Sequence, residues 1–411
     1  MQKAWLLLLT SLACTPQTGA DSAYGSENIA RIELARTWHL TSSKLQATIT
    51  LPASHPEARV AVEGTGGVTI ASGETPVEIS LQGLEPGEHQ LVVSDDDQVL
   101  GRATFKLSAP LYVVVSTDWD DTRMSDAFLD RMDKLRERHP ELKVTQFFAP
   151  YHYTDPQITA ERRSQIDAWI KQQRDRYGDE IGVHIHGWCH FIQAKTNVTC
   201  NTADTFYVDD GSGYTTILAS YSVAEMTQIL QASVDTFEEH GLGTPASFRA
   251  GGWTADGGTL RALVNAGFAI DSSAVPAHRL AVWRGYELFD WNTAHWAGIT
   301  ETSQPYYPLE TNIAKPDPQH RLPILEVPDN GVLVDYVTGA DMVQIYDLNH
   351  DGGVLEVPTL YQVGWHPPNF SEDFLSRMDQ ALTHVDAHLH QSDRGPAVYV
   401  NISELREVWP R

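Results

Sequence analysis

Residues 111–121 have the sequence LYVVVSTDWDD, in which a mainly apolar run, Leu111–Thr117, ends in three carboxylates within four residues. A short apolar run of this kind, bounded by polar residues, is typical of a buried strand. Asp118, Asp120 and Asp121 at one strand end repel one another and lose hydration, and a bound cation would offset that cost. The alternative is an acidic turn that caps the next helix, where aspartate is favoured.

Seven further short apolar runs follow this one, separated by amphipathic stretches with the period of a helix. One stretch starts at a capping box of Ser222 with Glu225 and ends at Gly241. Strands that alternate with helices indicate a parallel sheet, and seven or eight units predict a distorted (β/α) barrel over residues 110–411. Chemistry in such barrels lies at the carboxyl ends of the strands. The seven runs cover residues 144–149, 180–186, 246–250, 268–272, 322–328, 354–360 and 397–402.

The segment before this α/β pattern is different. A chain of 411 residues exceeds the usual size of one hydrophobic core, so we expect two domains. Residues 29–109 contain short stretches with period-two alternation, separated by Gly, Pro and Asp turns. This pattern predicts a small all-β domain, an immunoglobulin-like sandwich, that ends near Pro110. We expect it to act as a spacer, and glycan binding is the alternative role.

Residues 1–19 have the features of an export signal. Lys3 precedes the apolar run Leu6–Leu9, which is too short to span a bilayer. Ser11–Cys14 resembles a lipoprotein cleavage box, which would make Cys14 the acylated first residue of the mature chain, and residues 20–28 would be a polar tether. We expect an exported protein, periplasmic or a lipoprotein of the outer membrane or cell surface, and plain secretion is the alternative.

Charge and cysteine content limit the partners of the chain. With 54 acidic and 29 basic residues its net charge is −25, which excludes nucleic acid because phosphate binding needs a basic patch. We expect a monomer that contacts a membrane only through a lipid anchor on Cys14. Cys189 and Cys200 could form a disulfide across a short loop in an exported protein, or remain two unpaired thiols.

The third apolar run ends in the sequence HIHGWCH over residues 184–190. Neutral imidazole is the commonest nitrogen ligand of zinc. If one helical turn follows the strand, His186 and His190 could face a single ion, whereas His184 and His186 share a strand face and form the alternative pair. One aspartate with two histidines leaves open coordination positions, as in catalytic rather than structural sites. Such a site suits Zn²⁺, with Co²⁺ or Ni²⁺ as alternatives.

These motifs resemble those of the polysaccharide deacetylase family (carbohydrate esterase family 4, NodB-homology type) over about residues 111–405. Asp118-Trp119-Asp120 is similar to the Asp-x-Asp form of the family's first motif. The resemblance implies that Asp118 is the catalytic base and Asp120 a metal ligand. A rival register, with Asp120 as the base and Asp121 as the ligand, stays open.

Two more motifs follow in family order. Glu180-Ile181-Gly182, followed by His186-Gly187-Trp188-Cys189-His190, resembles the second motif and implies His186 and His190 as metal ligands, with His184 as an alternate. Phe248–Trp253 resembles the third motif, whose arginine contacts the catalytic aspartate, although the usual proline is absent. That role falls to Arg249.

The last two motifs imply a general acid. Asp271 resembles the aspartate of the fourth motif, which orients the catalytic histidine, and His366 in Trp365-His366-Pro367 is the candidate for that histidine. His350 and His295 are weaker candidates. Three tryptophans beside the motifs could stack on sugar rings or simply pack: Trp188, Trp253 and Trp365.

The resemblance implies a metal-dependent hydrolase that removes N-acetyl or related acyl groups from a cell-wall or surface glycan. A non-catalytic glycan-binding lipoprotein with a degenerate site and a metal-dependent amidase on a non-sugar substrate are the alternatives. Asp347–Gly352 looks like the start of a calcium loop, but Pro358 stands where that loop needs a glutamate, so a tight turn is expected instead.

Overall fold

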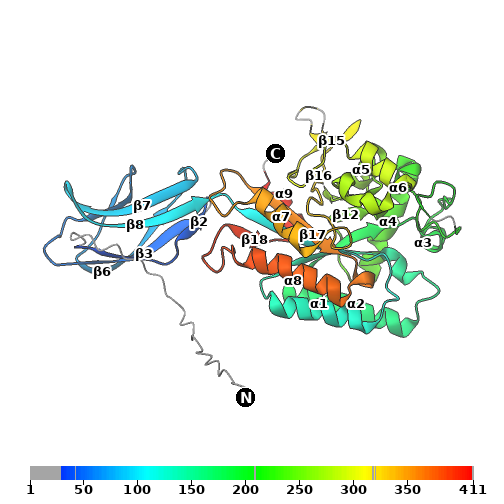
Figure 1. The fold of residues 1–411 in the computed structure, drawn as a ribbon, viewed down its shortest axis with the longest axis horizontal. Helices are drawn as coiled ribbons and strands as arrows, with labels where there is room; N and C mark the ends of the chain where they lie inside the picture. Colours follow the sequence, from blue (N-terminus) through cyan, green and yellow to red (C-terminus); the bar gives the residue numbers. More distant parts are fainter. Residues whose placement is uncertain (1–28, 42, 208–209, 317–318, 320, 410–411) are drawn as a thin grey trace, which may run out of the picture. The chain divides into compact units, whose positions relative to one another are not determined.

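The computed structural model describes residues 29–41, 43–207, 210–316, 319 and 321–409 (Figure 1). The expected export signal, the tether and Cys14 lie outside the described residues. Within those ranges, no helix combines the length and the apolar character needed to cross a bilayer.

The first eight strands form two sheets. Their orders are β1-β3-β6 and β2-β8-β7-β4-β5. In β3, buried and more exposed residues alternate, as the period-two pattern predicts. The bounds are β1 (Arg31–Leu34), β2 (Trp38–Leu40), β3 (Lys44–Leu51), β4 (Arg59–Val62), β5 (Val68–Thr69), β6 (Gly73–Ser80), β7 (Gly87–Asp95) and β8 (Gln98–Ser108).

The chain divides into two compact units, and the division does not follow the expected boundary. One unit contains the described residues up to Ala35, with Gln46–Ile79 and Gln90–Thr104. The other contains Arg36–Leu45, Ser80–His89 and the chain from Phe105 onward. The immunoglobulin-like sandwich and its end near Pro110 stay predictions.

The later strands form one eight-stranded parallel sheet, so the expected mixed α/β fold is confirmed. The strand order is β16-β13-β12-β11-β10-β9-β17, and β18 also pairs with β9. Nearly every residue of β9 is buried, as expected for a strand inside a parallel sheet covered on both faces. The bounds are β9 (Leu111–Asp118), β10 (Val144–Phe148), β11 (Glu180–Ile185), β12 (Ser247–Ala250), β13 (Ile270–Asp271), β16 (Leu325–Glu326), β17 (Thr359–Trp365) and β18 (Ala397–Tyr399).

Helices follow most of these strands and pack in pairs outside the sheet, α7 with α8, α8 with α1, and α4 with α5 (Figure 1). The capping box at the start of α4 is confirmed, since Ser222 and Glu225 satisfy each other's backbone N–H groups. The bounds are α1 (Asp126–Arg138), α2 (Ala160–Tyr177), α3 (Cys189–Lys195), α4 (Val223–Glu239), α5 (Gly257–Asn265), α6 (Glu287–His295), α7 (Gly339–Asn349), α8 (Glu372–Asp386) and α9 (Leu405–Val408), with a two-stranded sheet of β14 (Pro308–Leu309) and β15 (Asn312–Pro316).

The chain after β16 continues along β17. The N–H of Gly331 donates to the carbonyl of Gln362 at 2.8 Å, and the N–H of Val334 donates to that of Gly364 at 2.8 Å. Leu333 and Gly364 form an isolated parallel bridge. These contacts join the segment that follows β16, one outer strand of the sheet order, to β17, the other.

Two expectations about the C-terminal part were wrong in detail. The strand expected at 354–360 begins only at Thr359, directly after Pro358, which cannot donate to a sheet. The loop expected at Asp347–Gly352 is in its first half the end of α7. Asp347 forms an ion pair there with His384 at 2.7 Å.

Gly364 allows β17 to approach β9 closely, and a substitution there tests how much stability depends on that approach. A Cβ atom at Gly364 would lie 2.2 Å from the backbone oxygen of Ser116 in β9. Gly364→Ala should therefore lower the free energy of unfolding by about 1–3 kcal/mol, as overpacking does. Chemical denaturation measures this, with Gly66→Ala as the control because nothing lies within 4 Å of its Cβ position. Equal stability of both variants would contradict the close approach.

Candidate metal centre

The candidate site lies where β9 and β11 end. Asp118 is the last residue of β9 and Asp120 follows two residues later. His184 lies within β11, and His186 directly follows its last residue, Ile185. Residues two apart on a strand share one face, so both imidazoles project from the same side of the sheet.

Asp120, His184 and His186 converge on one point. The Nε2 atom of His184 lies 2.9 Å from Asp120 Oδ1, and the Nε2 atom of His186 lies 3.2 Å from the same oxygen. One ligand atom from each of the three residues lies within 4.8 Å of the other two, the single such group among the described residues. Burial alone would raise the pKa of Asp120, but His186, His366 and His184 hold it well below its usual range.

Both imidazoles are oriented by backbone carbonyl groups. His184 Nδ1 lies 3.0 Å from the carbonyl oxygen of Arg249, and His186 Nδ1 lies 2.9 Å from that of Tyr214. A carbonyl only accepts hydrogen bonds, so each Nδ1 donates to its carbonyl, and in the neutral ring a proton on Nδ1 leaves the lone pair on Nε2. This is the tautomer that binds a metal ion through Nε2.

The three residues therefore fit a divalent cation. Two imidazole nitrogens and one carboxylate oxygen are ligands that zinc, cobalt and nickel accept. Three protein ligands leave further coordination positions open, as in catalytic rather than structural sites.

His190 does not belong to this group, which corrects the expected pair of His186 and His190. β11 ends at Ile185 and α3 begins at Cys189, so His186 directly follows the strand whereas His190 lies in the first turn of α3. The His190 ring lies against Trp188, with centroids 5.4 Å apart, and its Nδ1 is 2.9 Å from the hydroxyl of Thr154. The alternate ligand, His184, takes the place expected for His190.

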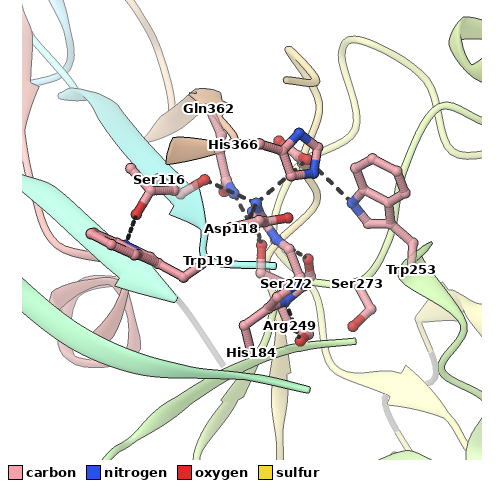
Figure 2. Close-up of polar contacts among 12 residues, drawn as sticks. Ser116, Asp118, Trp119, His184, Arg249, Trp253, Ser272, Ser273, Gln362 and His366 are labelled. Atoms are coloured by element: carbon pink, nitrogen blue, oxygen red, sulfur yellow. Dashed lines mark hydrogen bonds and ion pairs between the residues drawn. The ribbon is translucent and has the colours of Figure 1, made fainter. Parts of the chain in front are cut away.

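Asp118 is held by a buried arginine, as expected (Figure 2). Arg249 NH1 donates to Asp118 Oδ1 at 2.9 Å and to the hydroxyl of Ser116 at 3.0 Å. Its other nitrogens donate to the carbonyl and hydroxyl oxygens of Ser272, and its guanidinium lies over the ring of Phe147 at 4.6 Å. The Arg249 side chain is fully buried and Asp118 is 3% exposed, so this is not a surface salt bridge.

Asp121 lies outside the group. Both of its oxygens contact the side chain of Arg123, at 2.9 Å and 2.8 Å from Nε, and the carboxylate is 31% exposed. Asp120, not Asp121, faces the imidazoles. This placement favours the register with Asp118 as the base over its rival.

His366 follows the last residue of β17 and reaches the same site. Its Nε2 is 3.8 Å from Asp120 Oδ2, and its Nδ1 forms an ion pair with Asp335 at 2.9 Å. Burial alone would lower the pKa of His366, but Asp335 and Asp120 outweigh that effect and raise it to about 10. The other candidates lie elsewhere: His350 contacts the carbonyl of Gly353, and His295 stacks on Trp291.

Asp271 does not orient His366, so that expectation was wrong. It pairs in register with Glu326 of the adjacent strand, and both side chains are fully buried. Ser273 donates to Asp271 at 2.7 Å. Burial raises the pKa of Asp271, and burial together with Asp271 raises that of Glu326 well above its usual range. The orienting carboxylate is Asp335, which the sequence analysis missed.

Asp329 is the fourth carboxylate near the site, after Asp118, Asp120 and Asp335. Asp329 lies 3.7 Å from Arg249 NH1 and accepts a hydrogen bond from Trp253 Nε1 at 3.3 Å. Burial raises the pKa of Asp329 to about 6, with Asp118 adding to the shift and Arg249 opposing it.

The site opens into a narrow cavity of about 60 Å³, which has room for a few waters or a small acyl group. Asp118 and His366 lie in its wall with the three proposed ligands, and the other lining residues are mostly aromatic: Phe206, Tyr207, Tyr214, Gly252, Trp253, Trp283, Leu288 and Tyr336. The tryptophans expected to stack on sugars are poorly placed, since Trp253 is 3% exposed, Trp365 is 2% exposed and Trp188 stacks on Tyr214.

A disulfide closes the loop beside the site. Cys189 and Cys200 are bonded, which settles the two expectations in favour of pairing. The loop beyond it carries Tyr214, whose hydroxyl donates to Asp120 Oδ2 at 2.9 Å. Burial and Asp120 raise the pKa of Tyr214 well above its usual value, so the phenol stays a neutral donor.

No family model matches the chain, and no curated protein matches it either. Several solved structures are similar. One, described as a polysaccharide deacetylase from Mycobacterium smegmatis, has 14% sequence identity and a TM-score of 0.43 over 73% of this chain and 90% of that one. A family 4 acetyl xylan esterase from Clostridium thermocellum with a cobalt ion has 12% identity and a TM-score of 0.36 over 72% and 91%.

A third similar structure is a carbohydrate esterase family 4 pseudoenzyme from Bacillus anthracis, with 11% identity and a TM-score of 0.36 over 78% of this chain and 84% of that one. Similarity at these levels transfers no activity to this chain, which therefore has to be inferred from its own residues. The similar solved structures are polysaccharide deacetylases and other members of carbohydrate esterase family 4, the family that the motifs of this chain resemble.

Proposed function

We propose that this chain is a metal-dependent hydrolase that removes N-acetyl or related acyl groups from a cell-wall or surface glycan. The observation that carries the proposal is the convergence of Asp120, His184 and His186 beside Asp118 and His366 on one small cavity. A degenerate, non-catalytic site would lack one of these groups, and a ligand set, a base and an acid are all present.

A divalent cation held by Asp120, His184 and His186 would supply a Lewis acid for an acyl oxygen and lower the pKa of a bound water. Zn²⁺ is our first choice, with Co²⁺ or Ni²⁺ as alternatives. Asp118 takes the proton of the attacking water. Arg249 donates to Asp118 Oδ1, so the carboxylate keeps one orientation for this task.

His366 protonates the leaving group of the glycan. Its ring lines the cavity and is held through Nδ1 by Asp335, so Nε2 points toward Asp120 and the reacting atoms. A histidine oriented by a carboxylate in this way is a typical general acid. Asp118 and His366 thus divide the two proton transfers of acyl hydrolysis.

Exposed aromatic rings at the cavity support a glycan rather than a non-sugar amide. Tyr207 and Trp283 line the cavity, and their centroids are 5.0 Å apart. Tyr286 lies next to them, 5.8 Å from Trp283. Tyr207 is 38% exposed and Tyr286 46% exposed, so both offer an apolar face with a polar tip. We propose that these rings, rather than Trp188, Trp253 or Trp365, form the surface on which a sugar ring stacks.

We also propose that the protein is exported. The Cys189–Cys200 disulfide supports an oxidising location outside the cytoplasm. Anchoring through Cys14 and the monomeric state are further parts of this proposal.

The ligand set can be tested with three alanine variants. His184→Ala and His186→Ala should each abolish Zn²⁺ binding and acetate release from acetylated glucosamine oligomers, because each removes one of three ligands. His190→Ala is the matched control, from the same motif but outside the group, and should keep the metal. Metal analysis and an acetate assay are the measurements.

Asp118→Asn separates binding from turnover in the same assays, since it should keep the metal and lose acetate release. Full activity of a metal-free variant, or metal loss in His190→Ala with retention in His184→Ala, would contradict the assignment. Metal binding without acetate release by the native chain would favour the glycan-binding alternative.

The aromatic surface predicts a difference between long and short substrates. Tyr286→Ala should raise KM for an acetylated oligosaccharide about fivefold, corresponding to ~1 kcal/mol of lost stacking, and leave kcat unchanged. Hydrolysis of a small acetate ester should not change, because such an ester does not reach Tyr286. Val282→Ala, an exposed neighbour without a ring, is the control. An equal loss on both substrates would argue against stacking.

A further inference from the structure

Tyr214 lies in the segment that follows the Cys189–Cys200 disulfide loop, and it contacts two of the three proposed metal ligands. Its hydroxyl donates to Asp120 Oδ2 at 2.9 Å, and its backbone carbonyl accepts the Nδ1 hydrogen of His186 at 2.9 Å. We propose that Tyr214 is a positioning residue that presets Asp120 and His186 for the cation, and that the Cys189–Cys200 loop holds it in place. This inference rests on the proposed function.

The two contacts fix complementary features of the ligands. With Oδ2 of Asp120 engaged by a phenol, Oδ1 is the oxygen that faces both Nε2 atoms, at 2.9 Å and 3.2 Å. With Nδ1 of His186 engaged by a carbonyl, its Nε2 keeps the lone pair. Outer contacts of this kind fix ring orientation and tautomer before a metal ion arrives.

The third ligand is oriented by a different part of the fold. The carbonyl that accepts from His184 Nδ1 belongs to Arg249 in β12, a strand inside the sheet. Support for His184 is therefore built into the sheet, whereas support for His186 and Asp120 depends on a loop. Substitutions that disturb this loop should therefore change the affinity of the site for a metal ion.

Several contacts hold the loop against the start of α3. The N–H of Cys189 donates to the carbonyl of Ser212 at 2.8 Å, and the hydroxyl of Thr216 donates to the carbonyl of Asn201 at 2.8 Å. The disulfide joins Cys189 to Cys200, next to Asn201, so it ties together the two places at which these bonds hold residues 212–216.

Gly213 allows this close packing. Its φ is +77°, and a Cβ atom there would lie 2.2 Å from the carbonyl oxygen of Gly187 and 3.0 Å from both sulfur atoms. Only glycine fits such a position without strain. The next residue, Tyr214, is thereby fixed beside the disulfide, and its ring stacks on that of Trp188 with centroids 4.8 Å apart.

If Tyr214 acted only through the packing of its ring, removal of its hydroxyl would leave the metal affinity unchanged. Tyr214→Phe keeps the ring contacts with Trp188 and His186 and the backbone carbonyl, and it deletes only the bond to Asp120. The Co²⁺ affinity of the full chain, stripped of metal by a chelator and titrated by calorimetry, isolates that bond without an activity assay. Tyr207→Phe is the matched control, because Tyr207 lines the same cavity from the same loop.

We expect Tyr214→Phe to weaken Co²⁺ binding by roughly tenfold to a hundredfold, the range for lost outer contacts, with an unchanged melting temperature. The double variant Cys189→Ala/Cys200→Ala should weaken binding as well, and Tyr207→Phe should not. Binding by Tyr214→Phe within about twofold of the native chain would overturn the inference and leave the proposed function intact. A native chain that binds no Co²⁺ would overturn the proposed function and this inference together.

Discussion

The site depends on how the charge of four carboxylates is balanced, because Asp118 and Asp120 line one small cavity and the other two lie against residues of its wall. Asp118, Asp120, Asp329 and Asp335 all lie within reach of Arg249 or of an imidazole. An uncompensated buried charge costs several kcal/mol, so each carboxylate must have a cationic partner or a proton. Arg249 supplies the positive charge on the Asp118 side through a fully buried guanidinium.

On the other side, Asp120 is balanced by imidazoles rather than by an arginine. His184 and His186 each donate Nδ1–H to a carbonyl, which leaves Nε2 without a proton in the neutral ring. In that form the two rings and the carboxylate direct lone pairs at one point, where a divalent cation would bind. The neighbouring groups have different tasks in the proposed mechanism, since Arg249 donates to Asp118, the proposed base, and His366, the proposed acid, lies between Asp335 and Asp120.

Much of this could be predicted from the sequence. Apolar runs that end in Asp118 and in the histidine cluster indicated parallel strands and the edge at which they meet, and the motif order identified Arg249 and His366. The choice of histidines could not be made, because residues two apart on a strand and four apart on a helical turn both share a face. The residue at which β11 ends and the turn at Gly187 begins decides between the two histidine pairs. The local sequence encodes such boundaries poorly.

Other parts of the site left no signal in the sequence. Asp335 follows no strand of its own, and among 54 acidic residues nothing marks it as the partner of His366. Asp271 resembled that partner, but it lies opposite Glu326 of the neighbouring strand. This pairing depends on the order of the strands in the sheet. Tyr214 reaches Asp120 from a segment that packs against the Cys189–Cys200 disulfide. Such contacts join segments that lie far apart in the sequence.

The central claim is that one cation binds between Asp120, His184 and His186. Anomalous diffraction from crystals soaked in Co²⁺ locates the ion directly. The account predicts one strong peak at about 2.0–2.2 Å from Asp120 Oδ1 and from the Nε2 atoms of both histidines, the distances usual for such ligands. No peak there, or a peak bound instead by His190 or Asp121, would contradict it.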